Sequence, residues 1–252
     1  MEVHAHTHTA RKKWTHYLWE FLMLFLAVFC GFLAENQREH IVERQREKKY
    51  MLSLVEDLKA DTAFINNDII DKWKKVMGLD SLIRNLNSKD VFSKQVEIYR
   101  QFRTYNPILT PLFNDQTIFQ LRSSGNMRLI RNDSVINLIS KYWNKKNTLI
   151  KIAERVEQRI DFGSTYNIKI FNRKYTEREY QDPNFEGMDV DSSMNIDPNA
   201  RFMTSDIREL EEYANIMFKV SASIKIYIDR LKDMKEDALK LLNFVKKEYH
   251  LK

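Results

Sequence analysis

The stretch from residue 14 to residue 34, WTHYLWEFLMLFLAVFCGFLA, most limits what this chain can fold into. As an α-helix it would be roughly 31 Å long, which matches the hydrocarbon thickness of a bilayer. Trp14, Tyr17 and Trp19 place aromatic side chains at its N-terminal end, as is typical of a membrane interface. We therefore expect a single transmembrane helix over 14–34, with the lipid bilayer as its first partner.

A cleaved signal peptide is the alternative interpretation of this apolar segment. It is disfavoured because the segment has no convincing small-x-small cleavage site followed by a polar start. Helical character also continues beyond it, with no Gly or Pro between Gly31 and Gly78. We expect an uncleaved anchor that continues into a charged helical stalk over 35–60.

One face of the expected membrane helix carries small residues and a single carboxylate. Spacing of four and three residues brings together Glu20, Leu24, Ala27, Gly31 and Ala34. The bulky side chains of Phe21, Phe25, Phe29 and Phe32 lie on another face, which suits lipid. Because small residues let helix backbones approach closely in a bilayer, we expect the helix to form a homo-oligomer through the small face.

The carboxylate of Glu20 has two interpretations. It lies close enough to the end of the segment to reach headgroup water. Alternatively, it faces a helix–helix contact and takes part in ion or proton movement, as in a stator-like membrane component. We favour the first interpretation, because no second ionisable residue is expected to continue a path along the helix.

Orientation is predicted from the flanking charges. Basic residues precede the segment at Arg11, Lys12 and Lys13, and more follow it, so the raw count does not decide the matter. The positive-inside rule applies to short segments, whereas a long domain is translocated largely regardless of its charge. We expect a cytoplasmic tail over 1–13 and a periplasmic domain attached to a bacterial inner membrane. Cys30 is the only cysteine, so no disulfide forms within the chain.

Two stretches of the sequence are similar to a known family. They are WEFLMLFLAVFCGFLAENQREHIVERQREKKYMLSLVEDLKADT and FQLRSSGNMRLIRNDSVINLISKYW. They resemble uncharacterised single-pass membrane proteins of Bacteroidetes, which form a domain of unknown function. That family likewise has a Glu near the start of the membrane segment and Gly-x-x-Ala near its end, matching Glu20 and 31–34. The chain departs from it at 35–38, which read ENQR. The resemblance implies location and architecture, and no activity.

The remainder, 61–252, is expected to form an elongated antiparallel bundle with coiled-coil-like long helices, giving an all-α protein. The chain has only 5 Gly and 4 Pro, and its apolar residues recur at helical spacing. We expect the first helix to end near Met77, a second long helix kinked at Gly163, and a last helix over 206–250. Ser221 and Lys235 interrupt the apolar seam of that last helix.

A corner is expected between the first and second long helices. Asn114 is predicted to cap a short helix, and Gly125 to adopt the left-handed conformation that ends it. Either Asn132 or Asp133 is expected to cap the next helix.

Enzymatic activity is not expected, because the chain has no nucleophile elbow, phosphate-binding Gly loop or His-Glu-x-x-His motif. His4, His6 and His8 could bind a transition metal, but such tail histidines are more often incidental, and we expect no metal and no cofactor. Asp189, Asp191, Ser193 and Asp197 imitate a calcium loop. However, Met194 replaces the required Gly and Ala200 the required Glu.

Nucleic acid is not an expected partner. The net charge is +6, but 41 basic residues are interleaved with 35 acidic ones and form no continuous basic stripe. The sequence therefore favours a membrane-anchored, self-associating helical scaffold that interacts with other envelope membrane proteins. The alternative is an ion- or proton-coupled transport component that uses Glu20.

Overall fold

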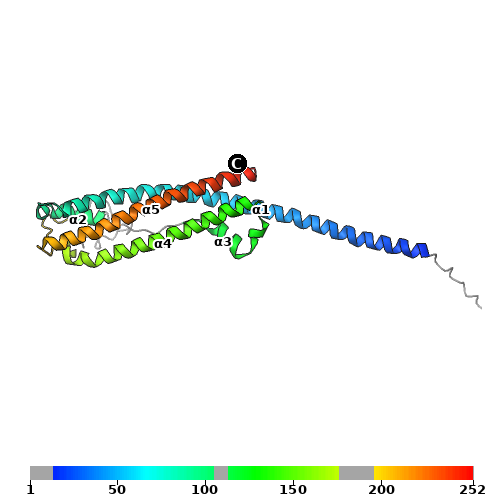
Figure 1. Cartoon of the computed structure of the whole chain (residues 1–252), viewed down its shortest axis with the longest axis horizontal. Helices are drawn as coiled ribbons and strands as arrows, with labels where there is room; N and C mark the ends of the chain where they lie inside the picture. Colours follow the sequence, from blue (N-terminus) through cyan, green and yellow to red (C-terminus); the bar gives the residue numbers. More distant parts are fainter. Residues whose placement is uncertain (1–13, 105–112, 176–195, 252) are drawn as a thin grey trace, which may run out of the picture. The chain divides into compact units, whose positions relative to one another are not determined.

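The computed structural model describes residues 14–104, 113–175 and 196–251, and its α-helical architecture agrees with the expected fold class. The helices are α1 (Trp14–Leu86), α2 (Gln95–Thr104), α3 (Gln116–Ser123), α4 (Asp133–Ile170) and α5 (Ile207–Glu248), with short 3-10 turns at Val91–Ser93, Asn126–Leu129 and Arg173–Tyr175 (Figure 1). The described residues contain no strand, and their one isolated β-bridge joins Phe171 to Phe202. The chain divides into two compact units, Met1–Tyr50 and Met51–Lys252.

The described part of the first unit is helical throughout. It contains the apolar segment, and α1 is the one helix in the described ranges that is long and apolar enough to cross a membrane. Phe21, Phe25 and Phe29 stack in sequence along one side, with ring centroids 6.3 Å and 5.9 Å apart. No residue of the most apolar window is buried within the protein. These side chains therefore present a continuous apolar surface to the surroundings.

The C-terminal end of α1 differs from the expectation. The helix does not stop near Met77 but continues through the buried Gly78 to Leu86. A helical glycine costs about 1 kcal/mol relative to alanine. Four side chains of this last section are almost fully buried: Val76, Leu79, Leu82 and Leu86. Burying each large apolar side chain contributes about 1.5–3 kcal/mol, which outweighs the cost of the glycine. The chain leaves the helix in a turn at 87–90.

α1 and α5 run antiparallel within the second unit. Asp80 of α1 accepts hydrogen bonds from Ser221 at 2.7 Å and Lys225 at 2.9 Å, whereas Asn66 accepts one from Lys235 at 2.8 Å. Residue numbers thus fall along α1 as they rise along α5. The two polar interruptions predicted in the seam of α5, Ser221 and Lys235, both bind polar groups of α1.

α4 and α5 also run antiparallel, and they form the most extensive helix pair of the described residues. Lys141 binds Asp237 near one end of the pair, and Tyr166 binds Glu212 near the other. α4 continues through Gly163 as one helix from Asp133 to Ile170. A Cβ atom at Gly163 would lie 2.7 Å from Met217 Cε and 3.3 Å from Ile216 Cγ2. The glycine therefore permits close approach of α5.

Each long helix contributes a stripe of buried apolar side chains to the core of the bundle. The stripes include Leu54, Leu58 and Ile65 of α1, Val135, Ile139 and Leu149 of α4, and Leu210, Ile224, Ile228, Leu231 and Leu241 of α5. Steps of three or four residues, such as Leu54 to Leu58, Val135 to Ile139 and Ile228 to Leu231, bring side chains to one face of a helix. The bundle is therefore held together mainly by apolar burial along its length.

Aromatic residues from α2 and the region after α4 form a cluster. The Tyr99 ring lies 5.0 Å from that of Phe171 and 6.1 Å from that of Phe202. Its hydroxyl accepts a hydrogen bond from the backbone N–H of Asn172 at 2.7 Å and donates one to the carbonyl of Arg201 at 2.9 Å. A single buried side chain thus joins the segments on either side of 176–195.

The corner between α3 and α4 agrees with the sequence in two of three details. Gly125 has a φ of 69°, the predicted left-handed conformation, and Asn132 caps α4 by accepting a hydrogen bond from the N–H of Ser134 at 2.8 Å. Asn114, however, does not cap α3, whose N-cap residue is Asp115. The backbone N–H of Asn114 instead donates to Asp61 of α1 at 2.6 Å.

Candidate functional site

The small face predicted on the apolar segment over 14–34 lies on α1, and all five of its residues are exposed: Glu20, Leu24, Ala27, Gly31 and Ala34. A Cβ atom built at Gly31 meets no atom within 4 Å outside the immediate helix. Side chains of a second helix could therefore approach this face directly. Cys30, in the same segment, is a free and exposed thiol.

Glu20 has a titratable partner that the sequence interpretation missed. His16 Nε2 lies 3.0 Å from Glu20 Oε1, and the side chains are 48% and 52% exposed. The two residues are four apart on one helix, so their side chains share a face. This four-residue spacing is the sequence feature from which the contact between His16 and Glu20 could have been predicted. His16 lies on the N-terminal side of Glu20, so the expectation that no second ionisable residue continues a path along the helix stays a prediction.

The candidate metal ligands receive no structural description. His4, His6 and His8 lie outside the described residues, as do Asp189, Asp191 and Ser193 of the calcium-like segment. Within the described ranges, no group of three or more His, Cys, Asp or Glu side chains is placed to hold a metal ion.

Among the described residues, Asp61 of α1 is the most deeply buried charged side chain, at 0% exposed. Its Oδ1 accepts a hydrogen bond from the backbone N–H of Asn114 at 2.6 Å, and its Oδ2 accepts one from the Tyr142 hydroxyl at 2.5 Å. One turn earlier on α1, Asp57 accepts a hydrogen bond from the N–H of Thr117 at 3.1 Å. These carboxylates bind the segment that leads into α3, and Asp61 also binds α4.

A buried lysine lies in the same group of polar residues as Asp57 and Asp61. Lys146 of α4 forms an ion pair with Asp115, and its Nζ lies 4.5 Å from the centre of the Trp143 ring. Removal from water raises the pKa of Asp61 above its usual value, although the donors from Tyr142 and Asn114 and the charge of Lys146 oppose the shift. Burial and the neighbouring Asp61 raise the pKa of Tyr142, so its hydroxyl remains a proton donor.

Two further acids of α1 are bound by α5. Asp68 accepts a hydrogen bond from the Tyr227 hydroxyl at 3.2 Å and pairs with Lys72 at 2.9 Å. Asp80 is bound by Ser221 and Lys225. Asp61, Asp68 and Asp80 are thus all engaged by donors of the bundle itself, an arrangement typical of structural contacts. The sequence interpretation identified none of these acids, because their partners are distant in sequence.

Comparison of the chain with models of known families, with curated proteins and with solved structures gives no match.

Proposed function

We propose that the protein is a membrane-anchored helical scaffold of the bacterial inner membrane, which self-associates and binds other envelope proteins. The observation that carries this proposal is the exposed apolar surface over 14–34 on the same helix, α1, that supplies core residues such as Leu54 and Ile65 to the bundle. Apolar surface of this extent is stable only in lipid or against other apolar surface. We therefore propose that the segment 14–34 anchors the bundle in a membrane.

Self-association is the second part of the proposal. Packing between helices in lipid depends on close backbone contact, which Ala27, Gly31 and Ala34 permit. All three are exposed in the single chain. The long helices of the bundle would add coiled-coil-like contacts with partners. We also propose that the chain is a member of the Bacteroidetes membrane-protein family that its sequence resembles.

A structural role, rather than catalysis, is supported by the interior of the bundle. The buried acids Asp61 and Asp68 accept hydrogen bonds from tyrosines of α4 and α5. Such contacts fix the register of helices that apolar packing alone would hold less specifically. Scaffolds require this kind of rigidity.

Cysteine labelling tests the membrane placement and the orientation. In a Cys30→Ala background, Glu236→Cys introduces a thiol on α5, at a side chain that is 72% exposed. An impermeant thiol reagent applied to intact spheroplasts should label Glu236→Cys. The matched control, Ala10→Cys in the tail, should be labelled only after lysis. Labelling of the control alone in intact spheroplasts would reverse the proposed orientation, and recovery of the chain without membranes would contradict the anchor.

A second candidate function is supported by the His16–Glu20 pair. Two titratable groups 3.0 Å apart near the start of a membrane segment could exchange a proton or hold a cation. In an oligomer, each chain would contribute one such pair. The protein would then be an ion- or proton-coupled component. Measurement of proton or sodium flux into reconstituted vesicles distinguishes this function from that of a scaffold.

A further inference from the structure

The surface of α1 carries histidine–carboxylate pairs within the first unit. His16 Nε2 lies 3.0 Å from Glu20 Oε1, and His40 Nδ1 lies 3.7 Å from Glu43 Oε2. Imidazole nitrogen and carboxylate oxygen are both ligands of zinc. Each pair therefore brings two metal-binding groups together on one helix.

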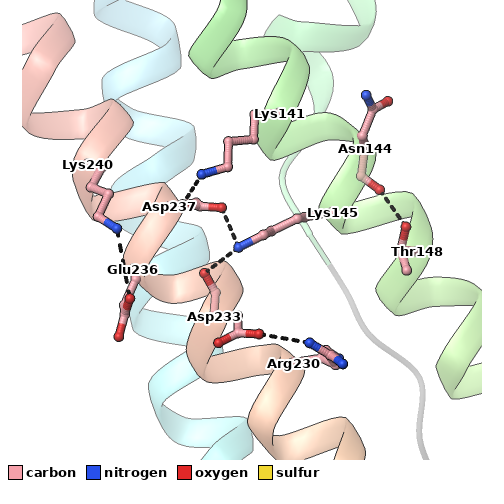
Figure 2. A network of polar contacts seen from close by, with 9 residues as sticks. All are labelled: Lys141, Asn144, Lys145, Thr148, Arg230, Asp233, Glu236, Asp237 and Lys240. Atoms are coloured by element: carbon pink, nitrogen blue, oxygen red, sulfur yellow. Dashed lines mark hydrogen bonds and ion pairs between the residues drawn. The ribbon is translucent and has the colours of Figure 1, made fainter.

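The charged clusters of the second unit are of a different kind. Figure 2 shows one of them, in which Lys141 and Lys145 of α4 meet Asp237 of α5 at 3.1 Å and 2.5 Å. Arg230 and Asp233 form a separate pair beside it, at 3.1 Å. A charged lysine or arginine has only N–H donors and cannot bind a metal. This cluster is therefore a contact of the folded bundle, whereas the pairs on α1 consist of metal ligands.

The distance within the His16–Glu20 pair suits a shared metal ion. Zinc lies about 2.1 Å from imidazole nitrogen and from carboxylate oxygen, in a tetrahedral arrangement. Two ligand atoms of such a site are therefore roughly 3.4 Å apart. The observed 3.0 Å is close to this value, so a small separation of the two side-chain ends admits the ion. Both side chains are about half exposed, so an ion can reach them.

One chain supplies only half of a zinc site. Structural zinc is almost always bound by four ligands, and no group of three or more His, Cys, Asp or Glu side chains in the described ranges is placed to hold a metal. A second copy adds an equivalent pair when the same surface meets itself about a two-fold axis. Two carboxylates and two neutral imidazoles balance the two charges of zinc, which limits the cost of placing the ion beside apolar surface.

The pair lies on the side of α1 that would meet a second copy. At 3.6 residues per turn, His16 and Glu20 both point within about 20° of the direction of Ala27, in the middle of the small face. Copies that insert in the proposed single orientation are parallel. The His16–Glu20 pairs of two copies associated through the small face would therefore lie at the same level.

The second pair provides an internal comparison. His40 and Glu43 point about 140–160° away from Ala27, on the other side of the helix. A copy packed against the small face does not approach them. The two pairs thus have similar chemistry but differ in whether a second copy can complete a site.

We infer that two copies of the chain bind one zinc ion between their His16–Glu20 pairs, a site that rests on the proposed self-association and strengthens it. Zinc adds to the packing of the small face and is not required for it. Because the four-ligand site exists only between associated chains, zinc binding favours the associated state by mass action.

Equilibrium dialysis of the full chain in detergent against zinc measures the stoichiometry. His4, His6, His8 and Cys30 are first replaced by alanine, since they are competing ligands outside the proposed site. This background should bind about one zinc ion for every two chains. Magnesium in excess should not displace zinc, because it prefers oxygen ligands in an octahedral arrangement.

Light scattering over a dilution series measures the effect of zinc on association. Free zinc at about ten times its dissociation constant should lower the chain concentration at which the oligomer dissociates by about tenfold, relative to a chelator. In the chelator, the mass should be that set by the small face alone. His16→Ala and Glu20→Gln should therefore keep the mass of the background there and lose the response to zinc.

The variants also separate a shared site from one within a single chain. His16→Ala and Glu20→Gln should weaken zinc binding by more than about tenfold, since loss of even an outer partner of a ligand costs that much. Gly31→Leu keeps both ligands but should bind zinc weakly, because its copies do not meet. His40→Ala is the matched control and should bind zinc as the background does. Circular dichroism checks that each variant is folded.

The outcomes distinguish the zinc site from the self-association on which it rests. An oligomer in the chelator that binds no zinc would overturn the site and leave self-association standing. A chain that is monomeric both in zinc and in the chelator would overturn both. Undiminished zinc binding by His16→Ala, or one ion per chain in Gly31→Leu, would place the metal elsewhere or within one chain and would also overturn the inference.

Discussion

The hydroxyl of Tyr142 on α4 donates a hydrogen bond to Asp61 Oδ2 on α1 at 2.5 Å, and the two residues are 1% and 0% exposed. The other oxygen of Asp61 accepts the backbone N–H of Asn114. One carboxylate therefore binds α4 and the segment leading into α3. Both partners donate hydrogen bonds to Asp61. A substitute at this position must therefore accept both bonds, or accept one and form the other in the reverse direction.

Substitution of Asp61 should separate hydrogen bonding from charge. Asp61→Asn retains an acceptor for Asn114 and offers its amide to the Tyr142 oxygen, so unfolding free energy should change by less than about 1 kcal/mol at neutral pH. Asp61→Leu leaves the Asn114 N–H and the Tyr142 hydroxyl without this acceptor and should cost about 2–4 kcal/mol. Urea denaturation of the full chain in detergent, followed by circular dichroism, measures both. Equal losses in the two variants would show that the carboxylate charge itself is required.

The pH dependence of Asp61 has a definite sign. Burial raises its pKa in the folded state above the ordinary value of 3.8. Between 3.8 and the raised pKa, the folded protein binds more protons at this site than the unfolded chain, so the contribution of Asp61 to stability falls as pH rises. Asp61→Asn does not titrate. Its unfolding free energy relative to the wild type should therefore increase as pH rises through this window. A constant difference across the window would contradict the prediction.

Asp237 should show the opposite dependence. Lys145 and Lys141 outweigh the cost of its burial and lower its pKa below 3.8. Its contribution is therefore present above about pH 4 and lost as pH falls through the lowered pKa. Asp237→Asn should reduce unfolding free energy by about 1–2 kcal/mol at pH 7, with a smaller difference at acidic pH. The control is Asp229→Asn, an exposed residue that pairs with Lys232 and should have little effect at either pH.

Gly31→Leu should weaken the oligomer without unfolding the chain. An added Cβ at Gly31 meets no atom within 4 Å outside the immediate helix, so the bulky side chain can interfere only with a second helix. Light scattering of the chain in detergent should show a lower mass, with an unchanged circular dichroism spectrum. Val28→Leu, on an exposed position of the same segment, is a control for added bulk. An unchanged mass for Gly31→Leu would place self-association elsewhere.

Glu20→Gln tests the choice between scaffold and ion-coupled component. The variant removes the charge that pairs with His16 but retains a side chain of similar shape. If the protein is a scaffold, Glu20→Gln should keep the oligomer mass and the partners of the wild type. Proton or sodium flux into vesicles containing either the wild type or Glu20→Gln should then equal the flux into empty vesicles. Flux in the wild type that is lost in Glu20→Gln, with unchanged oligomer mass, would support the ion-coupled function instead. Glu20→Asp, which keeps a titratable group, should then restore part of the flux.

Local patterns were sufficient to predict the helical parts of this protein. The apolar helix over 14–34 needs only a continuous apolar run. α5 needs only apolar residues at helical spacing, so the bounds 206–250 and Ile207–Glu248 nearly coincide. The left-handed Gly125 and the cap at Asn132 are equally local. Each of these features depends on residues within a few positions of one another, whose interactions are the same in any fold.

The end expected for α1 near Gly78 was misjudged because local propensity is only part of the free energy. Gly78 and Gly163 both weaken an isolated helix, but burial of Leu79 and Leu82 supports the first, and the second allows close contact with Met217. The sequence contains these glycines and the apolar residues that pack around them, but it does not show which of them come into contact.

The partners of the acids on α1 depended entirely on tertiary structure. Tyr142 lies 81 positions from Asp61, and Tyr227 lies 159 positions from Asp68. Helical spacing specifies which face of a helix is apolar, but not which neighbour covers it or at what register. That register is determined when the helices pack, because the apolar contacts and the buried hydrogen bonds must be satisfied together.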